Sequence, residues 1–225
     1  MTLAELIAAY RTDANDKVVP YFASDEDVTG WLNEAENEAA IRGRLIHESD
    51  IAAVCQIAVV AGTASYPLHG SLYELSHVAF RKEGDAERKP VRLVSSEYLD
   101  ACMRDWRDRE GCPLYAIQGD SGIRLVPRPL EAGTLLLEGY RLPMEPMLLD
   151  EQETATPEIN GAHHRHLVQW AMHRGFSIPD MESFDPNRAG LAEAAFTQYF
   201  GHRPDSDLRR ITREDVPQTV KAFWP

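Results

Sequence analysis

The spacing of the apolar residues changes twice along this 225-residue chain. Residues 1–50 follow the spacing of amphipathic helices, residues 51–149 mainly the alternation of β-strands, and residues 150–202 helical spacing again. Helices and strands do not alternate, which excludes a parallel α/β sheet and predicts an α+β protein. Because each helical block is too small to form a core alone, we expect the two blocks to pack as one helical bundle with a β-rich domain inserted between them.

Capping residues predict where the helices begin and end. Thr2-x-x-Glu5 is a capping-box pattern, and Ser24 is an N-cap candidate followed by Asp25, Glu26 and Asp27. These three acids could be imagined as a cation site, but the helix dipole explains them better. In the later block, Pro157 suits the first turn of a helix that runs to Gly175, and a final helix is expected from Asp185-Pro186 to a C-cap at Gly201.

The middle of the chain predicts an antiparallel β-rich domain. A turn at Gln118-Gly119-Asp120-Ser121-Gly122 should join two strands as a hairpin. Residues 96–109 resemble a polar helix among the strands. The expected strands cover residues 57–61, 73–80, 91–94, 114–117, 123–126 and 134–141.

The composition of the chain limits the classes of function that it can have. The formal charge of −13 has the wrong sign for gripping a phosphate backbone, so specific or tight DNA binding is not expected. Cys55, Cys102 and Cys112 are an odd number without C-x-x-C spacing, which argues against a disulfide framework or a structural zinc site and fits a reducing compartment. With no signal-peptide pattern and no apolar stretch of spanning length, we expect a cytosolic protein when it is made.

The best candidate for an active site is a row of histidines. His163, His166 and His173 fall within an arc of about 80° on a helix and could ligate a transition metal. The alternative function is therefore a hydrolase or metal-dependent enzyme that uses this helix face. Surface or partly packed histidines are the favoured interpretation, because the zincin spacing with an intervening glutamate is absent. Ser121 lies in the predicted turn, and Cys102 and Cys112 are better explained as free cysteines that act as small buried hydrophobic residues. We expect no catalytic residue, metal or cofactor.

Residues 203–225 form the last segment, which has no sustained periodicity. It has more apolar side chains than a disordered, solvent-exposed tail would have, and burial of its aromatic side chains is favourable by several kcal/mol. The segment should therefore dock on its own domain or on another chain. We favour docking on another chain, as an extended arm. The basic run around Arg209 and Arg213 is assigned to protein contact. The apolar members are Leu208, Ile211, Val216, Val220, Phe223 and Trp224.

The order and spacing of several short motifs resemble the head-to-tail adaptor, or connector, proteins of tailed bacteriophages, particularly those of short-tailed phages. None of the motifs is a catalytic signature, and the resemblance covers roughly residues 2–203. The matching pieces are Leu3-x-x-Leu6-Ile7, Asp25-Glu26-x-Val28-x-x-Trp31-Leu32-Asn33-Glu34-Ala35, Tyr66-Pro67-Leu68, Trp106, Cys112-Pro113-Leu114-Tyr115, Ile123-Arg124-Leu125-Val126-Pro127-x-Pro129, Tyr140-Arg141-Leu142-Pro143, Pro157 with His163, Leu167 and Trp170, and Phe196-x-x-x-Phe200-Gly201.

The resemblance implies a structural, non-enzymatic virion protein. Twelve copies would form a ring between the portal protein and the tail nozzle or tail tube, with genomic DNA passing through without specific binding and with no membrane involved. The protein would reside at the head-tail junction of the virion, and in the host cytoplasm before assembly. In this family the C-terminal arm commonly reaches the portal, which makes the tail residues portal-binding candidates: Leu208, Arg209, Ile211, Arg213, Val216, Val220, Phe223 and Trp224.

Overall fold

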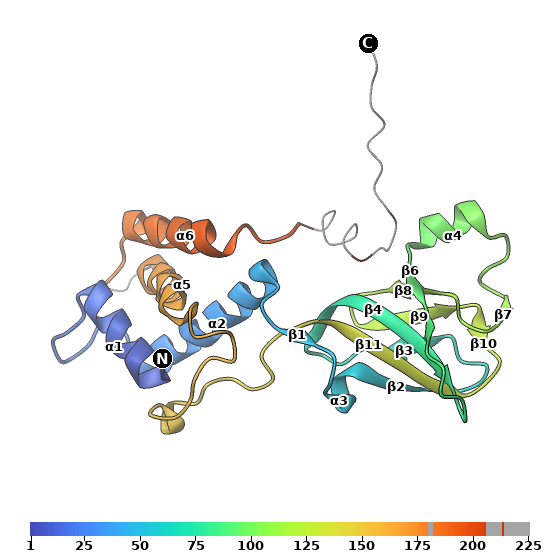
Figure 1. Ribbon diagram of the computed structural model, residues 1–225. Coiled ribbons are helices and arrows are strands. Elements are labelled where there is room, and N and C mark those ends of the chain that lie inside the picture. Colours follow the sequence, from blue (N-terminus) through green and yellow to red (C-terminus); the bar gives the residue numbers. More distant parts are fainter. Residues whose placement is uncertain (180–181, 206–212, 214–225) are drawn as a thin grey trace, which may run out of the picture. The chain divides into compact units, whose positions relative to one another are not determined.

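The computed structural model describes residues 1–179, 182–205 and 213 (Figure 1). Its contacts divide the chain into two compact units. The helical unit combines residues 1–46 with residues 141–204, and the β unit contains residues 47–140, with which residues 205 and 213 group. The predicted α+β class is confirmed, because helices and largely antiparallel sheets are both present.

The helical unit contains four long helices from the two ends of the chain, and a short 3-10 helix, η1, precedes α5. Their bounds are α1 Leu3–Ala14, α2 Asp25–Gly43, η1 Leu149–Glu151, α5 His164–Ser177 and α6 Pro186–Phe200.

The predicted N-caps of α1 and α2 are confirmed. Thr2 and Ser24 each accept a hydrogen bond from the backbone three residues on, at 3.3 and 3.0 Å, and Glu5 and Asp27 complete both capping boxes. In α6 the carboxylate of Asp185 caps the first turn.

The expected helix start at Pro157 is wrong, since α5 begins seven residues later, at His164. The reason is a tertiary contact. The N–H groups of Glu158 and Ile159 donate to Glu36 Oε1 on α2, at 2.5 and 3.3 Å, and this segment is therefore held as an irregular chain against α2.

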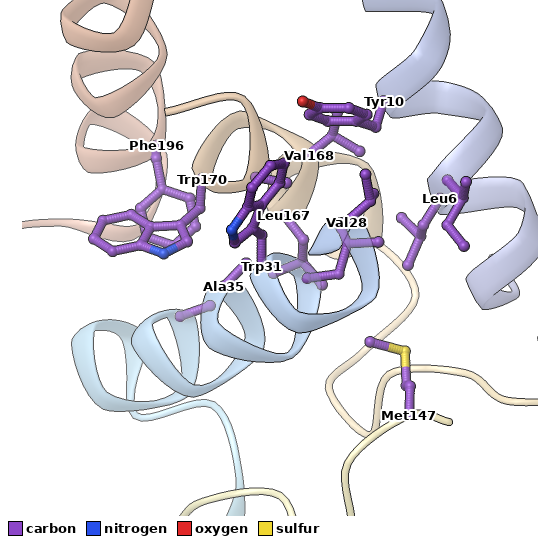
Figure 2. Packing of buried hydrophobic residues seen from close by; sticks show 14 of the residues in the cluster. Leu6, Tyr10, Val28, Trp31, Ala35, Met147, Leu167, Val168, Trp170 and Phe196 are labelled. Carbon is purple, nitrogen blue, oxygen red and sulfur yellow. The ribbon is translucent and has the colours of Figure 1, made fainter. Parts of the chain in front are cut away.

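One core joins the helices from both ends of the chain (Figure 2). Tyr10 of α1 and Trp31 of α2 face each other with ring centroids 5.9 Å apart, and Trp170 of α5 contacts Phe196 of α6 at 5.1 Å. Met147, in the segment that returns from the β unit, completes the cluster. Neither helical block would bury these side chains alone, which is why the blocks pack together.

The β unit consists of two long strands, β4 and β11, several short strands and two short helices. Its elements are β1 His47–Glu48, α3 Ala52–Cys55, β2 Gln56–Val59, β3 Ser65–Pro67, β4 Leu72–Lys82, β5 Lys89–Pro90, β6 Arg92–Leu93, α4 Ser96–Cys102, β7 Glu110–Gly111, β8 Tyr115–Gln118, β9 Gly122–Val126, β10 Arg128–Pro129 and β11 Gly133–Arg141.

Two sheets supply most of the β unit. One has the order β1-β11-β4-β5, with β2 also paired to β11, and the other has the order β3-β9-β8-β6. Strands β8 and β9 form the predicted hairpin. The expectation of antiparallel pairing alone is incomplete, because β6 pairs with β8 and β7 with β10 in parallel. These parallel ladders are only two residues long, too short to give a pattern in the sequence.

The helix expected over residues 96–109 is also shorter than predicted, since α4 ends at Cys102. The C-cap residue Met103 is already extended, with φ −136° and ψ 102°, and Asp105 beyond it has a left-handed backbone, φ 58°, so the right-handed helix does not resume there. The turn buries Trp106 against Leu99 and Val126, and the indole donates to Asp100 at 2.9 Å. Burial of this large aromatic side chain favours the turn over further helix.

Within the part of the chain that the structure describes, none of the helices has the length and apolar character needed to cross a membrane.

Candidate functional site

The candidate portal-binding residues fall almost entirely outside the described part of the chain. Leu208, Arg209, Ile211, Val216, Val220, Phe223 and Trp224 lie there. The exception is Arg213, whose guanidinium donates to the carbonyl of Tyr73 on β4 at 2.9 Å and lies 3.7 Å from a carboxylate oxygen of Asp120. Arg213 therefore contacts the β unit of its own chain, next to the β8–β9 turn.

The histidine face of α5 packs against α6. His166 stacks on Tyr199 with ring centroids 3.5 Å apart, and His163 Nδ1 lies 3.1 Å from the Tyr199 hydroxyl. His173 Nδ1 lies 3.1 Å from the carbonyl oxygen of Ala189 and must donate to it, because a carbonyl oxygen only accepts. Burial, followed by the nearby charges of His163 and Arg165, lowers the pKa of His166, so the imidazole favours its neutral form.

The same face does not bring three metal ligands together. Among the described residues, no group of three or more His, Cys, Asp or Glu side chains is arranged to hold a metal ion. The contacts of His163, His166 and His173 with α6 agree with the interpretation as partly packed side chains. The adjacent His164, which the sequence reasoning did not single out, is buried, and its Nε2 donates to the carbonyl of Ile159 at 2.9 Å.

A second feature missed from the sequence is a buried polar network where the chain re-enters the helical unit. Glu36 is 2 % exposed, and burial raises its pKa, although two backbone N–H donors favour the carboxylate. Glu158, whose N–H donates to Glu36, pairs through its own carboxylate with the buried Arg141. The N–H of Arg141 donates to the carbonyl of Ile46 at 3.0 Å. The network thus fixes the two chain segments that lead to and from the β unit.

The third feature is the loop between α1 and α2. Asp16 is buried, and its carboxylate pairs with Arg11 and accepts from the N–H of Phe22 at 3.1 Å. Arg11 also pairs with Asp25 at 2.6 Å, and its guanidinium lies 4.0 Å from the ring centroid of Tyr21. Although burial alone would lower it, the two carboxylates raise the pKa of Arg11. Asp25, considered above as a possible cation ligand, is thus engaged with an arginine.

Two further places in the β unit hold residues considered in the sequence analysis. A cavity of about 420 Å³ is lined by Cys112 and by charges of both signs, and the ammonium of Lys82 lies 2.6 Å from a carboxylate oxygen of Glu131. Ser121 lies between β8 and β9, and its carbonyl accepts from the N–H of Leu68 at 3.0 Å, as expected for a turn residue. Cys102 and Cys112 are exposed, so the expectation that they are buried is wrong.

Comparison with protein-family models assigns the chain to a family. The family model described as SU10 adaptor protein matches residues 1–221, which include both segments of the helical unit and the whole of residues 47–140. No curated protein matches the chain. The resemblance to phage head-to-tail adaptors is confirmed, and the chain belongs to the SU10 adaptor protein family, a family of structural phage adaptors.

Proposed function

We propose that copies of this chain form a ring between the portal protein and the tail nozzle or tail tube, and that the packaged DNA leaves through this ring. The observation that carries the proposal is the family match over residues 1–221. The match spans the helical unit, the inserted β unit and most of the C-terminal segment, so the family relationship applies to nearly the whole chain rather than to one shared motif. A dodecamer at the head-tail junction of a short-tailed virion is the specific form proposed.

The charge of the chain supports the conduit role. A subunit of net charge −13 repels phosphate, whereas a basic wall would hold the duplex at every step by releasing counterions. Genomic DNA is therefore a transient passenger in this proposal and not a bound ligand. The protein itself acts through surfaces and not through a reaction.

The C-terminal segment supplies the portal contact in this proposal. Its aromatic residues, Phe223 and Trp224, are of the type that dominates interface energetics, and the basic Arg209 would lie at the rim. Arg213 has a second role in the free subunit, where it contacts Tyr73 and Asp120 of the β unit.

The test is reconstitution. Purified full-length protein is mixed with purified portal rings, and the mixture is imaged by negative-stain electron microscopy and weighed by native mass spectrometry. We expect an additional ring of twelve copies at one end of the portal, whereas the free protein stays a monomer or small oligomer. Portal rings that remain bare at high micromolar protein would refute the proposal.

A further inference from the structure

We propose that the loop between α1 and α2 of one copy packs on the outer face of α6 of the next copy, so that neighbouring copies join head to tail. The inference rests on the proposed ring and names the two surfaces that would form it. The apolar loop is defined as residues 17–22, and the outer face of α6 as Leu191, Ala194, Ala195 and Tyr199.

The apolar loop exposes hydrophobic side chains that are adjacent in sequence. Val18 is 78 % exposed, Val19 74 % and Phe22 51 %. Single exposed apolar residues are common on soluble proteins, but a contiguous exposed set marks an interaction site.

The loop is also held in one shape. The Asp16 carboxylate binds the N–H of Phe22 and the guanidinium of Arg11, and the same guanidinium lies over the ring of Tyr21. Ser24, the N-cap of α2, fixes the other end. A surface ordered before binding loses less conformational entropy when a partner docks, so this loop is suited to be the inserting element of an interface.

The outer face of α6 is a second exposed apolar surface. Leu191 is 73 % exposed and Tyr199 43 %, and with Ala195 between them they follow the i, i+4, i+8 row of a helix. The opposite face of α6, which includes Phe196, packs in the core. The Tyr199 ring stacks on His166 of its own chain, so Leu191 is the most exposed large side chain of the row. Next to the row lies a shallow hollow that is open to solvent and is lined in part by Gly190 and Ala194.

A second copy of the chain is the occupant that fits both surfaces. Within one chain both surfaces are exposed, although Arg188 of α6 donates to the carbonyl of Asp13 near the start of the loop at 3.2 Å. Contact between copies that each carry a charge of −13 is opposed by repulsion.

One pair of opposite charges would offset part of this repulsion at the two surfaces. Residues 17–22 carry Lys17 and no acid, whereas Glu193 is the only acidic residue of α6 and lines the hollow. The approach of Lys17 to Glu193 is therefore attractive. Because the two surfaces differ, repeating the contact propagates from copy to copy and closes as a ring when the rotation permits.

Disulfide capture tests the pairing. The exposed Cys102 and Cys112 are replaced by serine in the full chain, and Val18→Cys is introduced in one preparation and Ala194→Cys in a second that carries a size tag. The preparations are oxidised mildly, alone and mixed, both as concentrated free protein and bound to portal. We expect a heterodimer only in the mixture, stopping at two chains because each chain has one reactive position. Asn37→Cys, exposed on α2, replaces Ala194→Cys in the matched control.

The outcomes separate this inference from the proposed ring. A heterodimer in the free protein without any ring on portal would support the contact and refute the proposed function. Portal-bound rings that give no more heterodimer than the Asn37→Cys control would refute the contact and leave the function standing. No heterodimer under either condition overturns the inference.

Charged substitutions in the loop give a second readout. Val18→Asp with Val19→Asp should weaken ring assembly on portal at least about tenfold, because aspartates would be buried against α6. Leu130→Asp, at an exposed apolar residue of the β unit, is the control and should leave assembly unchanged. Unchanged assembly of the loop variant, with its unfolding transition intact, would contradict the inference.

Discussion

Gly175 shows how closely the helices approach at a single position. A Cβ added at this residue of α5 would overlap the hydroxyl of Tyr10 and come within 3.1 Å of the Trp31 ring. Both aromatic side chains are buried, and burial raises the pKa of Tyr10 from 10 to about 12, so its hydroxyl stays neutral even in moderately alkaline solution. A glycine within a helix is intrinsically unfavourable, so the presence of Gly175 in the last turn of α5 is explained by the packing of α5 on α1 and α2.

Gly175→Ala should therefore destabilise the protein by about 1–3 kcal/mol, as overpacking of a buried site does. Gly30→Ala in α2 is the matched control, because a Cβ there has nothing within 4 Å. This control should raise stability by up to about 1 kcal/mol through helix propensity. Urea unfolding of the two variants checks the prediction, and a rise in stability for both would contradict it.

Glu36 presents a buried carboxylate whose pKa is raised mainly by burial. For an acid with a raised pKa, stability is greatest below the unfolded pKa and is lost as the pH rises through the folded pKa. Glu36→Gln keeps an oxygen acceptor for the N–H groups of Glu158 and Ile159 but cannot ionise. We expect the stability of Glu36→Gln relative to wild type to increase between about pH 4 and pH 7.

Urea unfolding at both pH values measures this difference. Glu36→Ala is the comparison variant, because it leaves the N–H groups of Glu158 and Ile159 without their acceptor and should cost about 1–3 kcal/mol at either pH. A relative stability of Glu36→Gln that falls as the pH rises would show that the charge at Glu36 is stabilising.

At the scale of the element, the loop between α1 and α2 depends on Asp16. Asp16 and Asp13 lie close together in sequence, and each pairs with an arginine. The Asp16 side chain is 4 % exposed and its partner Arg11 is buried. The side chains of Asp13 and its partner Arg165 are 23 % and 48 % exposed. Removal of one member of a buried pair leaves an uncompensated charge, while an exposed pair is weakly stabilising.

We therefore expect Asp16→Ala to lower stability by about 3–5 kcal/mol and Asp13→Ala by less than about 1 kcal/mol. Hydrogen exchange should also accelerate at the amides of Phe22 and Ala23, which donate to the Asp16 carboxylate. Equal stability losses for the two variants would contradict the prediction that the buried Asp16 stabilises the protein more than the exposed Asp13.

The elements also show which structural features could be predicted from the sequence. The caps at Thr2, Ser24 and Asp185 were predicted because capping is local and is encoded within four residues. The start of α5 was wrong because Glu36, more than 120 residues away in sequence, binds the backbone at Glu158. The length of α4 was wrong for the related reason that burial of Trp106 depends on residues elsewhere in the β unit.

The candidate functional residues also differ in whether a local sequence pattern encodes them. The histidine face was visible as a helical arc, but its packing against Tyr199 depends on how α5 meets α6. The polar network of Glu36, Glu158 and Arg141 joins three segments far apart in the chain, and its sequence carries no local signal. The exposed apolar loop was not predicted from the sequence, because the exposure of a side chain is a property of the folded unit.

At the scale of the whole molecule, the helical unit is assembled from both ends of the chain and the β unit from its middle. The helical unit has one hydrophobic cluster and the β unit has two, and among the described residues none of the three includes a side chain later in the chain than Phe200. In the proposed function the C-terminal segment serves a partner, and its contribution to the fold is measured by deleting it.

Deleting residues 204–225 should lower the thermal unfolding midpoint by no more than a few degrees and abolish attachment to portal. The deletion removes the hydrogen bond from Arg213 to Tyr73 and its 3.7 Å pair with the exposed Asp120, and such surface pairs contribute little to stability. Phe223→Ala with Trp224→Ala should account for much of the lost binding, since buried interface aromatics cost about 2 kcal/mol or more each. Scanning calorimetry and portal co-sedimentation measure the two effects.

Charge reversals separate the two roles of the segment. Arg209→Glu should weaken portal binding less than the aromatic pair does, and the effect should shrink with added salt, as expected for rim charges. Arg213→Glu should behave in the same way for portal and should in addition remove the contact with the β unit. If the truncated chain binds portal with unchanged affinity, or is unfolded, then the segment packs on its own chain. In that case the thermal unfolding midpoint of Arg213→Glu would show how much of the packing depends on Tyr73 and Asp120.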